Sequence, residues 1–251
     1  MTTGNKTLET ISVTKRFGGL TALDDVNYSI QEGEVRGIIG PNGAGKTTLF
    51  NVITGELKPT SGQIFLRGKE ITSLPPHVIC QEGLGRTFQL TFTFPEMTVY
   101  DSVWVGVNSK AKQPWNPFIL AHRVADLSQK AEEICQLVGL EDKMNELASN
   151  LSYGDQKILE IAMALSTQPS ILLLDEPTQG VSPQETDHVA EVIEKLSKKI
   201  TIILIEHSMD VVLRLCSNIT VLNEGRVVAE GSPKEVCKNE EVQRVYLGEI
   251  C

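Results

Sequence analysis

The chain has 251 residues, of which 41% are hydrophobic and 22% charged, and 23 Lys and Arg against 32 Asp and Glu give a formal net charge of −9. This length suits one large domain, or one domain with an added lobe, and the composition excludes a disordered protein. An acidic protein lacks the basic face that phosphate neutralisation requires, so we expect no nucleic acid among its partners. Because no apolar run is long enough to span a membrane and the N-terminal residues do not resemble a secretory signal, we expect a cytoplasmic protein.

The first segments alternate between apolar and polar residues over short stretches that are bounded by turn residues. Residues 8–13, 22–30 and 62–67 follow this pattern. Strict alternation is typical of half-buried strands, and turn residues between such strands favour hairpins. The sequence therefore predicts an N-terminal antiparallel β subdomain.

A strand, a glycine-rich turn and a helix are predicted in succession over residues 35–54. Residues 35–39 are mainly apolar, residues 40–47 read GPNGAGKT, and the helix at 48–54 is expected to end at Gly55. The turn matches the pattern GxxxxGK[ST] and lies where a phosphate-binding loop must lie, between a strand and a helix. A glycine-rich turn with a surface lysine is the simpler alternative, which this context disfavours.

The chemistry of this loop follows from its residues. Glycines let backbone N–H groups and the helix N-terminus converge on phosphate oxygens. Lys46 is predicted to reach the β- and γ-phosphates, and the Thr47 hydroxyl to coordinate Mg²⁺. The sequence thus predicts a nucleotide and Mg²⁺ as ligands, with these nucleotide-binding residues: Gly40, Pro41, Asn42, Gly43, Ala44, Gly45, Lys46, Thr47 and Thr48.

The middle of the chain predicts a separate helical lobe. Residues 94–149 are rich in helical patterns and interrupted by Pro114 and Pro117. Ser152 and Asp155 then form a potential capping box at the start of an amphipathic helix. A capping serine followed by a glycine also makes a helix N-terminus that binds anions, and the two roles are compatible.

A buried strand at 170–174 ends in two carboxylates, Asp175 and Glu176. Ligands of open α/β folds bind at the carboxyl edge of the sheet, so both side chains are expected beside the phosphate-binding loop. Asp175 is predicted to help hold Mg²⁺, and Glu176 to polarise the attacking water. An apolar strand that ends in Asp-Glu is commonly just a strand that enters a loop, but together with the phosphate-binding loop it indicates a nucleotide hydrolase.

The C-terminal part continues the alternation of strands and helices. The helix at 183–199 has Ser182 as its N-cap and Glu185 in a capping box, and the segment 201–205 is another buried strand. Strands that alternate with helices predict a parallel sheet. The expected fold class is therefore α/β: a P-loop NTPase core with a mainly parallel sheet, an N-terminal antiparallel β subdomain and an inserted helical subdomain.

Taken together, these motifs make the whole chain resemble the ABC-transporter ATPase family. The glycine-rich loop looks like Walker A, residues 151–156 (LSYGDQ) like the signature LSGGQ, and residues 172–176 like Walker B. Gln89 in RTFQ resembles the Q-loop glutamine, His207 the switch histidine, and Phe17 the aromatic that stacks on adenine. The resemblance implies one ABC ATPase domain over residues 1–251, with the nucleotide-binding core at 1–93 and 165–251 and the helical subdomain at 94–164.

The resemblance also implies a role for each of these residues. Gln89 would contact Mg²⁺ and link its site to the helical lobe, and His207 would contact the γ-phosphate and help Glu176 to position water. Ser152 and Gly154 would bind the phosphate held by a partner subunit. Three positions depart from the family pattern: Tyr153 and Asp155 in the signature, and Ser182 where the D-loop usually ends in Asp. Asp155 places a negative charge near a phosphate site.

Finer similarity points to one group of transporters. The segments FGGLTAL at 17–23, GRTFQ at 85–89 and YLGE at 246–249 are similar to ATP-binding subunits of branched-chain amino-acid importers. Importers of urea or amides and exporters of lipid or lipopolysaccharide are the alternatives, and a soluble ABC switch protein is a further one. The implied partners are transmembrane permease subunits, a second ABC ATPase subunit, identical or different, and indirectly a solute-binding protein. The implied location is the inner face of the cell membrane.

Overall fold

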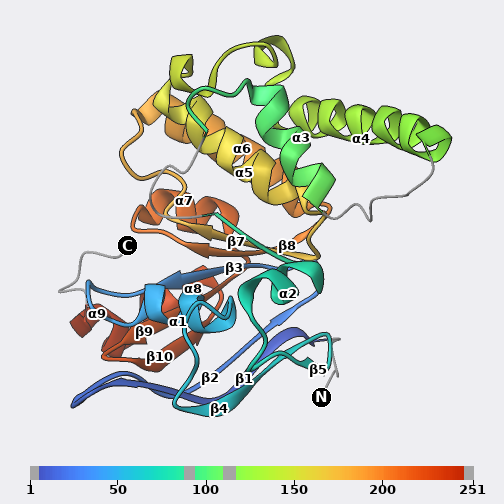
Figure 1. Cartoon of the computed structure of the whole chain (residues 1–251). Coiled ribbons are helices and arrows are strands. Elements are labelled where there is room, and N and C mark those ends of the chain that lie inside the picture. Colours follow the sequence, from blue (N-terminus) through green and yellow to red (C-terminus); the bar gives the residue numbers. More distant parts are fainter. Residues whose placement is uncertain (1–5, 88–93, 110–116, 246–251) are drawn as a thin grey trace.

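The structure, a computed structural model, describes residues 6–87, 94–109 and 117–245. Two sheets are stacked on each other, and a group of helices lies on the far side of the larger sheet (Figure 1). The smaller sheet has the strand order β2-β1-β4-β5 and is antiparallel. Its strands are β1 (Lys6–Phe17), β2 (Leu20–Gln31), β4 (Ser61–Leu66) and β5 (Lys69–Glu70).

The larger sheet has the strand order β10-β9-β3-β8-β7-β6, and all its described pairings are parallel except that of β10 with β9. This arrangement confirms the predicted P-loop NTPase architecture with a mainly parallel sheet and a separate antiparallel one. The strands are β3 (Val35–Ile39), β6 (Leu84–Arg86), β7 (Ile171–Asp175), β8 (Thr201–Ile205), β9 (Asn218–Asn223) and β10 (Arg226–Gly231).

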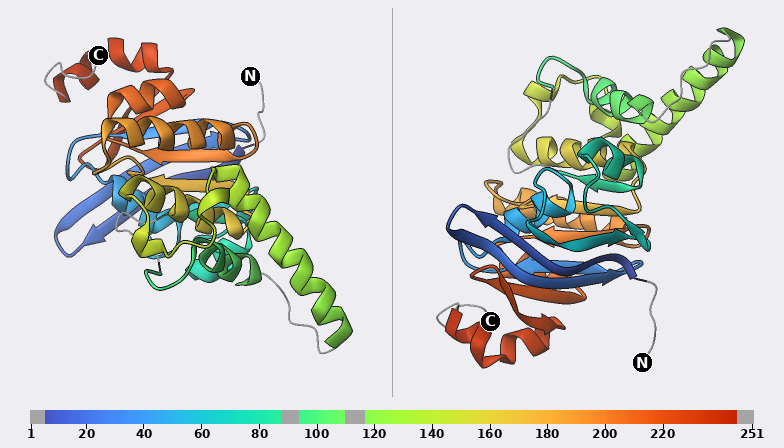
Figure 2. Two further views of the ribbon diagram at one scale, coloured as in Figure 1. Left: turned by 90° about the horizontal axis from the view of Figure 1, so that it is seen from above. Right: turned by 60° about the horizontal axis from the view of Figure 1, so that its bottom comes forward.

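Nine α-helices fall within the described residues. Helices α3, α4 and α5 lie together on one side of the larger sheet, and α4 extends away from the sheets in both views of Figure 2. None of the described helices is long and apolar enough to span a membrane. The helices are α1 (Lys46–Ile53), α2 (Pro76–Gln81), α3 (Val99–Ser109), α4 (Pro117–Val138), α5 (Tyr153–Ser166), α6 (Pro183–Ser197), α7 (Met209–Leu215), α8 (Pro233–Lys238) and α9 (Glu240–Val245).

The predicted elements are present, with some boundaries displaced. The helix predicted at 48–54 begins at Lys46, and the strand predicted at 170–174 runs from 171 to 175. The strands predicted at 8–13 and 22–30 are longer, with 12 residues each. Register shifts interrupt their alternation, and Ser12 has a φ of 49°. A bulge puts two successive residues opposite one, so a pattern of period two stops at it although the strand continues.

Two apolar clusters hold the layers together. One lies between the two sheets, where α1 contributes fully buried Leu49 and Phe50 beside residues of β1, β2 and β3. The other joins the opposite face of the larger sheet to the helices and contains Leu172 of β7 and Ile158 of α5. Burial of apolar surface on both faces explains why the central strands β7 and β8 are almost continuously apolar.

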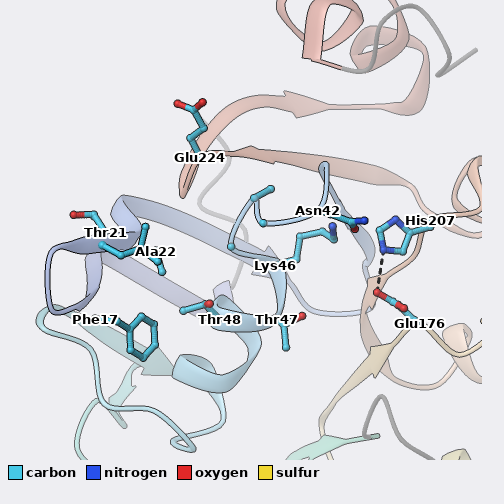
Figure 3. A pocket seen from close by; sticks show the side chains of 14 residues that line it. Phe17, Thr21, Ala22, Asn42, Lys46, Thr47, Thr48, Glu176, His207 and Glu224 are labelled. Carbon is cyan, nitrogen blue, oxygen red and sulfur yellow. Dashed lines mark hydrogen bonds and ion pairs between the residues drawn. The ribbon is translucent and has the colours of Figure 1, made fainter.

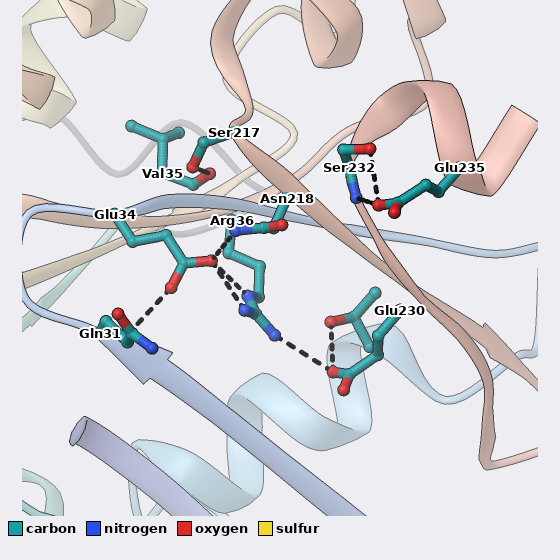
Figure 4. A network of polar contacts seen from close by, with 10 residues as sticks. Gln31, Glu34, Val35, Arg36, Ser217, Asn218, Glu230, Ser232 and Glu235 are labelled. Atoms are coloured by element: carbon teal, nitrogen blue, oxygen red, sulfur yellow. Dashed lines mark hydrogen bonds and ion pairs between the residues drawn. The ribbon is translucent and has the colours of Figure 1, made fainter. Parts of the chain in front are cut away.

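A polar network fastens the central strand β3 to its neighbours, away from the loop that follows β3 (Figure 4). Arg36 lies between two carboxylates, with Glu34 at 2.7 Å and Glu230 at 3.2 Å. Glu34 also accepts hydrogen bonds from the Gln31 amide at 2.9 Å and from Asn218 Nδ2 at 2.8 Å. The network thus connects the end of β2 with β3, β9 and β10, and every charge in it has a partner.

The parallel register determines which residues meet. Ile38 of β3 and Asp175 of β7 both pair with Ile205 of β8. The three strands therefore end at one edge of the sheet, and the segments that follow them, including residues 40–45, Glu176 and His207, come together there.

Candidate active site

A cleft of about 730 Å³ lies at this edge, between the loop after β3 and the hairpin that joins β1 to β2 (Figure 3). Its volume is in the range of small-molecule sites, about 300–1,000 Å³. Phe17 and the Glu176–His207 pair lie at opposite ends of it. The cleft is lined by Phe17, Leu20, Thr21, Ala22, Asn42, Gly43, Ala44, Gly45, Lys46, Thr47, Thr48, Glu176, His207 and Glu224.

The loop at 40–45 turns tightly and leads into α1. Gly45 has a φ of +103° and is the N-cap of α1, and its carbonyl accepts the Leu49 amide at 2.8 Å. A Cβ atom on Gly45 would lie 2.7 Å from the Ala22 carbonyl oxygen. Position 45 therefore requires glycine for its conformation and for the close approach of the β1–β2 hairpin. The helix N-terminus that this turn produces faces the cleft, as an anion site requires.

Lys46 brings a buried ammonium group to the centre of the loop. Its Nζ atom donates to the Gly40 carbonyl at 2.6 Å and to the Pro41 carbonyl at 3.1 Å, and the residue is only 6% exposed. Burial lowers the pKa of Lys46 below its ordinary value, and the nearby carboxylates of Glu176 and Asp175 oppose that shift. The loop thus holds the positively charged Lys46 near the carboxylates of Glu176 and Asp175.

Glu176 and His207 meet at the far end of the cleft. The distance from His207 Nε2 to Glu176 Oε1 is 3.0 Å. Glu176 is 5% exposed and has a φ of +51°, and its amide donates to the Ile205 carbonyl at 2.9 Å. A glutamate in the left-handed region is uncommon and is held there by its surroundings, which is frequent at functional sites. A carboxylate with an imidazole beside it can accept a proton from water.

Asp175 is the last residue of β7, directly before Glu176, and is not among the described residues that line the cleft. Its Oδ2 atom accepts a hydrogen bond from Arg86 Nη2 at 3.0 Å, whereas Oδ1 is buried and has no hydrogen-bond partner in the described parts of the chain. Burial raises the pKa of Asp175, and the Arg86 guanidinium opposes that shift. A buried carboxylate oxygen without a donor is suited to a cation.

The predicted signature segment lies at the start of α5, away from the lining of the cleft. Ser152 Oγ accepts the Asp155 amide at 3.2 Å and so caps the helix, as predicted. The Asp155 carboxylate accepts from Ser152 Oγ at 3.0 Å and from Lys143 Nζ at 2.5 Å. The negative charge that Asp155 adds therefore has a lysine beside it.

A capping box at the start of α6 reaches the same segment. Ser182 Oγ accepts the Glu185 amide, and Glu185 Oε2 accepts from the Ser182 amide at 3.1 Å, as the sequence predicts. Glu185 Oε1 also accepts from the Gly154 amide at 3.2 Å. Hydrogen bonds from the Ser182 side chain and amide and from the Gly154 amide lower the pKa of Glu185 to about 2.

The structure brings most of the sequence-predicted residues to one cleft, but not all of them. Gly40 and Pro41 contact Lys46 through their carbonyls, and Asp175 precedes Glu176 without lining the cleft. Ser152 and Gly154 lie at the N-terminus of α5, and Gln89 falls outside the described residues. The predicted residues that line the cleft are Phe17, Asn42, Gly43, Ala44, Gly45, Lys46, Thr47, Thr48, Glu176 and His207.

Four residues of the lining were missed: Leu20, Thr21, Ala22 and Glu224. Three of them directly follow Phe17 and its glycine turn, so a hairpin prediction could have placed them beside it. Glu224 lies in the turn between β9 and β10, where it carries no motif, and only the fold brings that turn to the β1–β2 hairpin.

Comparison with known proteins identifies the family. The model of the family "ABC transporter" matches residues 23–179, and that of "Branched-chain amino acid ATP-binding cassette transporter" matches residues 226–250. The chain is 43% identical over 241 residues to the high-affinity branched-chain amino acid transport ATP-binding protein LivG of Salmonella typhimurium, covering 93% of this chain and 94% of that protein.

Solved structures agree with this result. The ADP conformation of MJ1267, an ATP-binding cassette of an ABC transporter, superimposes with a TM-score of 0.85 at 35% identity, covering 97% of this chain and 99% of that one. A dimeric post-hydrolysis state of the cassette MJ0796, bound to ADP and Pi, gives a TM-score of 0.76 at 26% identity, covering 90% and 98%. The chain therefore belongs to the ABC transporter family, as one of its ATP-binding and ATP-hydrolysing cassettes.

Proposed function

We propose that this chain is the ATPase subunit of an importer that carries branched-chain amino acids across the cytoplasmic membrane. The observation that carries the proposal is the match of residues 226–250, outside the shared ATPase motifs, to a family named for branched-chain amino acids. The name of the LivG relative supports the same solute. The solute itself would be selected by permease subunits and a binding protein.

The proposed reaction is attack of water on the γ-phosphate of ATP. The adenine would stack on Phe17, which is 45% exposed at one end of the cleft, and the phosphates would run along the loop toward Lys46. Glu176 would polarise the water, and His207, which contacts its carboxylate, would hold the water and the γ-phosphate in line. The ammonium of Lys46 would move from the loop carbonyls to the phosphate oxygens.

The residues present fit a magnesium ion. Oδ1 of buried Asp175, which has no hydrogen-bond partner in the described ranges, and the hydroxyl of Thr47 at the start of α1 are oxygen ligands of the kind that Mg²⁺ prefers. Thr47 and Asp175 would hold the ion together with phosphate oxygens and water, and Gln89 is proposed as a further contact. When bound, Mg²⁺ neutralises charge on the phosphates.

We further propose that the working unit is a head-to-tail dimer on the inner face of the membrane. Ser152 and Gly154 are not among the described residues that line the cleft around Lys46, so a second cassette would supply its signature to this nucleotide. The dimeric MJ0796 structure is a precedent for cassette pairing. The partner is an identical or a related cassette, and both would dock on permease subunits.

The test is reconstitution of the cassette with its permease subunits and binding protein in lipid vesicles. Leucine, isoleucine or valine should stimulate ATP hydrolysis and enter the vesicles, whereas a Lys46→Ala cassette should support neither. If urea or amides stimulate hydrolysis, or if lipid does so in the absence of a binding protein, that compound would be the transported substrate instead. The ATPase assignment would be unaffected. An assembled complex in which no solute of this panel stimulates hydrolysis would contradict the solute proposal.

A further inference from the structure

Arg86 joins three elements at the base of the active site. It is the last residue of β6, its side chain is 9% exposed, and its Nη2 atom lies 3.0 Å from Asp175 Oδ2 at the end of β7. Its Nη1 atom donates to Asn51 Oδ1 at 2.6 Å and to Thr54 Oγ1 at 3.2 Å, at the end of α1. The ring of Phe50 lies 5.7 Å from the guanidinium carbon. Because a guanidinium is planar and its donors point in fixed directions, these contacts hold it in one orientation.

Two hydrogen bonds determine how the Asp175 carboxylate is oriented. Its Oδ2 atom accepts a hydrogen bond from Arg86, and the Asp175 amide donates to Thr87 Oγ1 at 3.2 Å. The remaining oxygen, Oδ1, is buried and has no hydrogen-bond partner among the described residues. With the backbone and one oxygen held, the carboxylate cannot rotate freely, and Oδ1 is the oxygen left to accept a ligand.

We propose that Arg86 is a positioning residue for the magnesium–nucleotide complex: by binding Asp175 Oδ2 it presents Oδ1 to the metal site, and it thereby sets how strongly a divalent cation favours nucleotide binding. This inference rests on the proposed function, in which Asp175 helps to hold Mg²⁺. Partners that orient a metal ligand typically contribute about 10- to 100-fold to metal affinity.

Two other roles for Arg86 make different predictions. If Arg86 only tied α1 to the sheet, its removal would lower stability and leave the effect of the metal unchanged. If Arg86 acted only as a nearby positive charge, its removal would strengthen metal binding, because like charges repel. If Arg86 orients Asp175, its removal should instead weaken metal binding, and Mg²⁺ should then raise the ATP affinity of the variant by less.

The experiment compares nucleotide affinity with and without metal in the full chain. Glu176→Gln serves as the parent protein, so that hydrolysis does not disturb the titration. Calorimetry gives the ATP affinity in EDTA and in Mg²⁺, and Mn²⁺ titration followed by electron paramagnetic resonance gives the metal affinity of the ATP complex. Arg86→Met and Arg86→Lys are the test variants. Asn51→Ala is the matched control, since it removes a bond between Arg86 and α1 and leaves Asp175 untouched.

We expect Arg86→Met to lower the affinity for Mn²⁺, and the gain in ATP affinity from Mg²⁺, by at least about tenfold, while the affinity in EDTA changes little. Arg86→Lys should show a smaller loss in the same direction. In Asn51→Ala, Thr54 Oγ1 still accepts from the same Nη1 atom of Arg86, so this variant should lower the melting temperature and leave metal binding unchanged. Unchanged or stronger metal binding in Arg86→Met would overturn the inference. If that variant fails to fold, wild-type metal binding in Arg86→Lys would do so. A parent protein whose ATP affinity does not respond to Mg²⁺ would overturn the proposed function itself.

Discussion

His207 Nε2 lies 3.0 Å from Glu176 Oε1, although the two residues are 31 positions apart in the chain. Each follows the carboxyl end of a strand, Glu176 directly after β7 and His207 two residues after β8, and the pairing of Asp175 with Ile205 sets those ends side by side. The buried glutamate and the half-exposed histidine thus form one unit that faces the loop with Lys46. This unit is where we expect proton transfer from water.

Replacing Glu176 with Gln should abolish hydrolysis and preserve ATP binding. The amide is nearly the same size but cannot accept the proton, and loss of a general base costs about 10²–10⁴-fold in rate. Steady-state phosphate release and calorimetry measure the two properties, and gel filtration with ATP should detect a trapped dimer. Glu224→Gln, at the other end of the same cleft, is the control and should keep its activity. Hydrolysis of ATP at the wild-type rate by Glu176→Gln would show that Glu176 does not polarise the attacking water.

Gly45→Ala should damage the protein far more than Gly43→Ala does. Both glycines have positive φ, +103° and +81°, so each substitution carries backbone strain. A Cβ at position 45 would also meet the Ala22 carbonyl oxygen at 2.7 Å, whereas a Cβ at position 43 meets nothing within 4 Å. Urea unfolding should show a loss of at least about 1 kcal/mol more for Gly45→Ala, from the clash. Equal losses would mean that the hairpin does not constrain the loop.

Lys143→Met should weaken ATP-driven dimerisation of the Glu176→Gln protein by a few-fold. Its partner Asp155 would then carry an uncompensated negative charge at the start of α5, where the proposed dimer brings a phosphate. The pair is partly exposed, which corresponds to about 0.2–1 kcal/mol. Analytical ultracentrifugation at several protein concentrations measures the effect.

The control for this effect is an additional Asp155→Asn change. If charge is the cause, it should restore dimerisation to the Lys143→Met protein. Lys130→Met, an exposed position on α4, should have no effect. Failure of Asp155→Asn to restore dimerisation would point to a structural cause instead.

The pH dependence of stability should report the capping box of Glu185. Its pKa falls from 4.5 to about 2 in the folded state, chiefly because of the Ser182 hydroxyl. A lowered pKa stabilises the fold at pH values above 4.5, and that stabilisation is lost as the pH falls toward 2. The gap in urea midpoint between wild type and Glu185→Gln should therefore be widest at pH 6–7 and shrink below pH 4.5. Glu191→Gln, on the exposed face of α6, controls for removal of a charge; a gap that stays constant with pH would contradict the assignment.

Patterns among residues close together in the chain were sufficient to predict the fold class and many of the candidate site residues. The glycine-rich turn between β3 and α1, the carboxylates after β7 and the caps of α5 and α6 all depend on residues close together in the chain. Boundaries were less accurate where a bulge interrupts alternation in β1, or where Gly45 rather than an ordinary N-cap residue starts α1. Periodicity cannot detect an irregular residue inside a strand, since it assumes a regular one.

Residue types and their spacing are enough to predict the chemistry: a loop of N–H groups and an ammonium for phosphate, and carboxylates for metal and water. Which of these groups come into contact depends on the fold. The Arg86–Asp175 ion pair spans 89 positions, and Glu224 reaches the cleft only because the β9–β10 turn packs on the β1–β2 hairpin. No residue type or spacing encodes such contacts, because they depend on the strand order of the sheet and on the orientation that buried neighbours impose on each side chain.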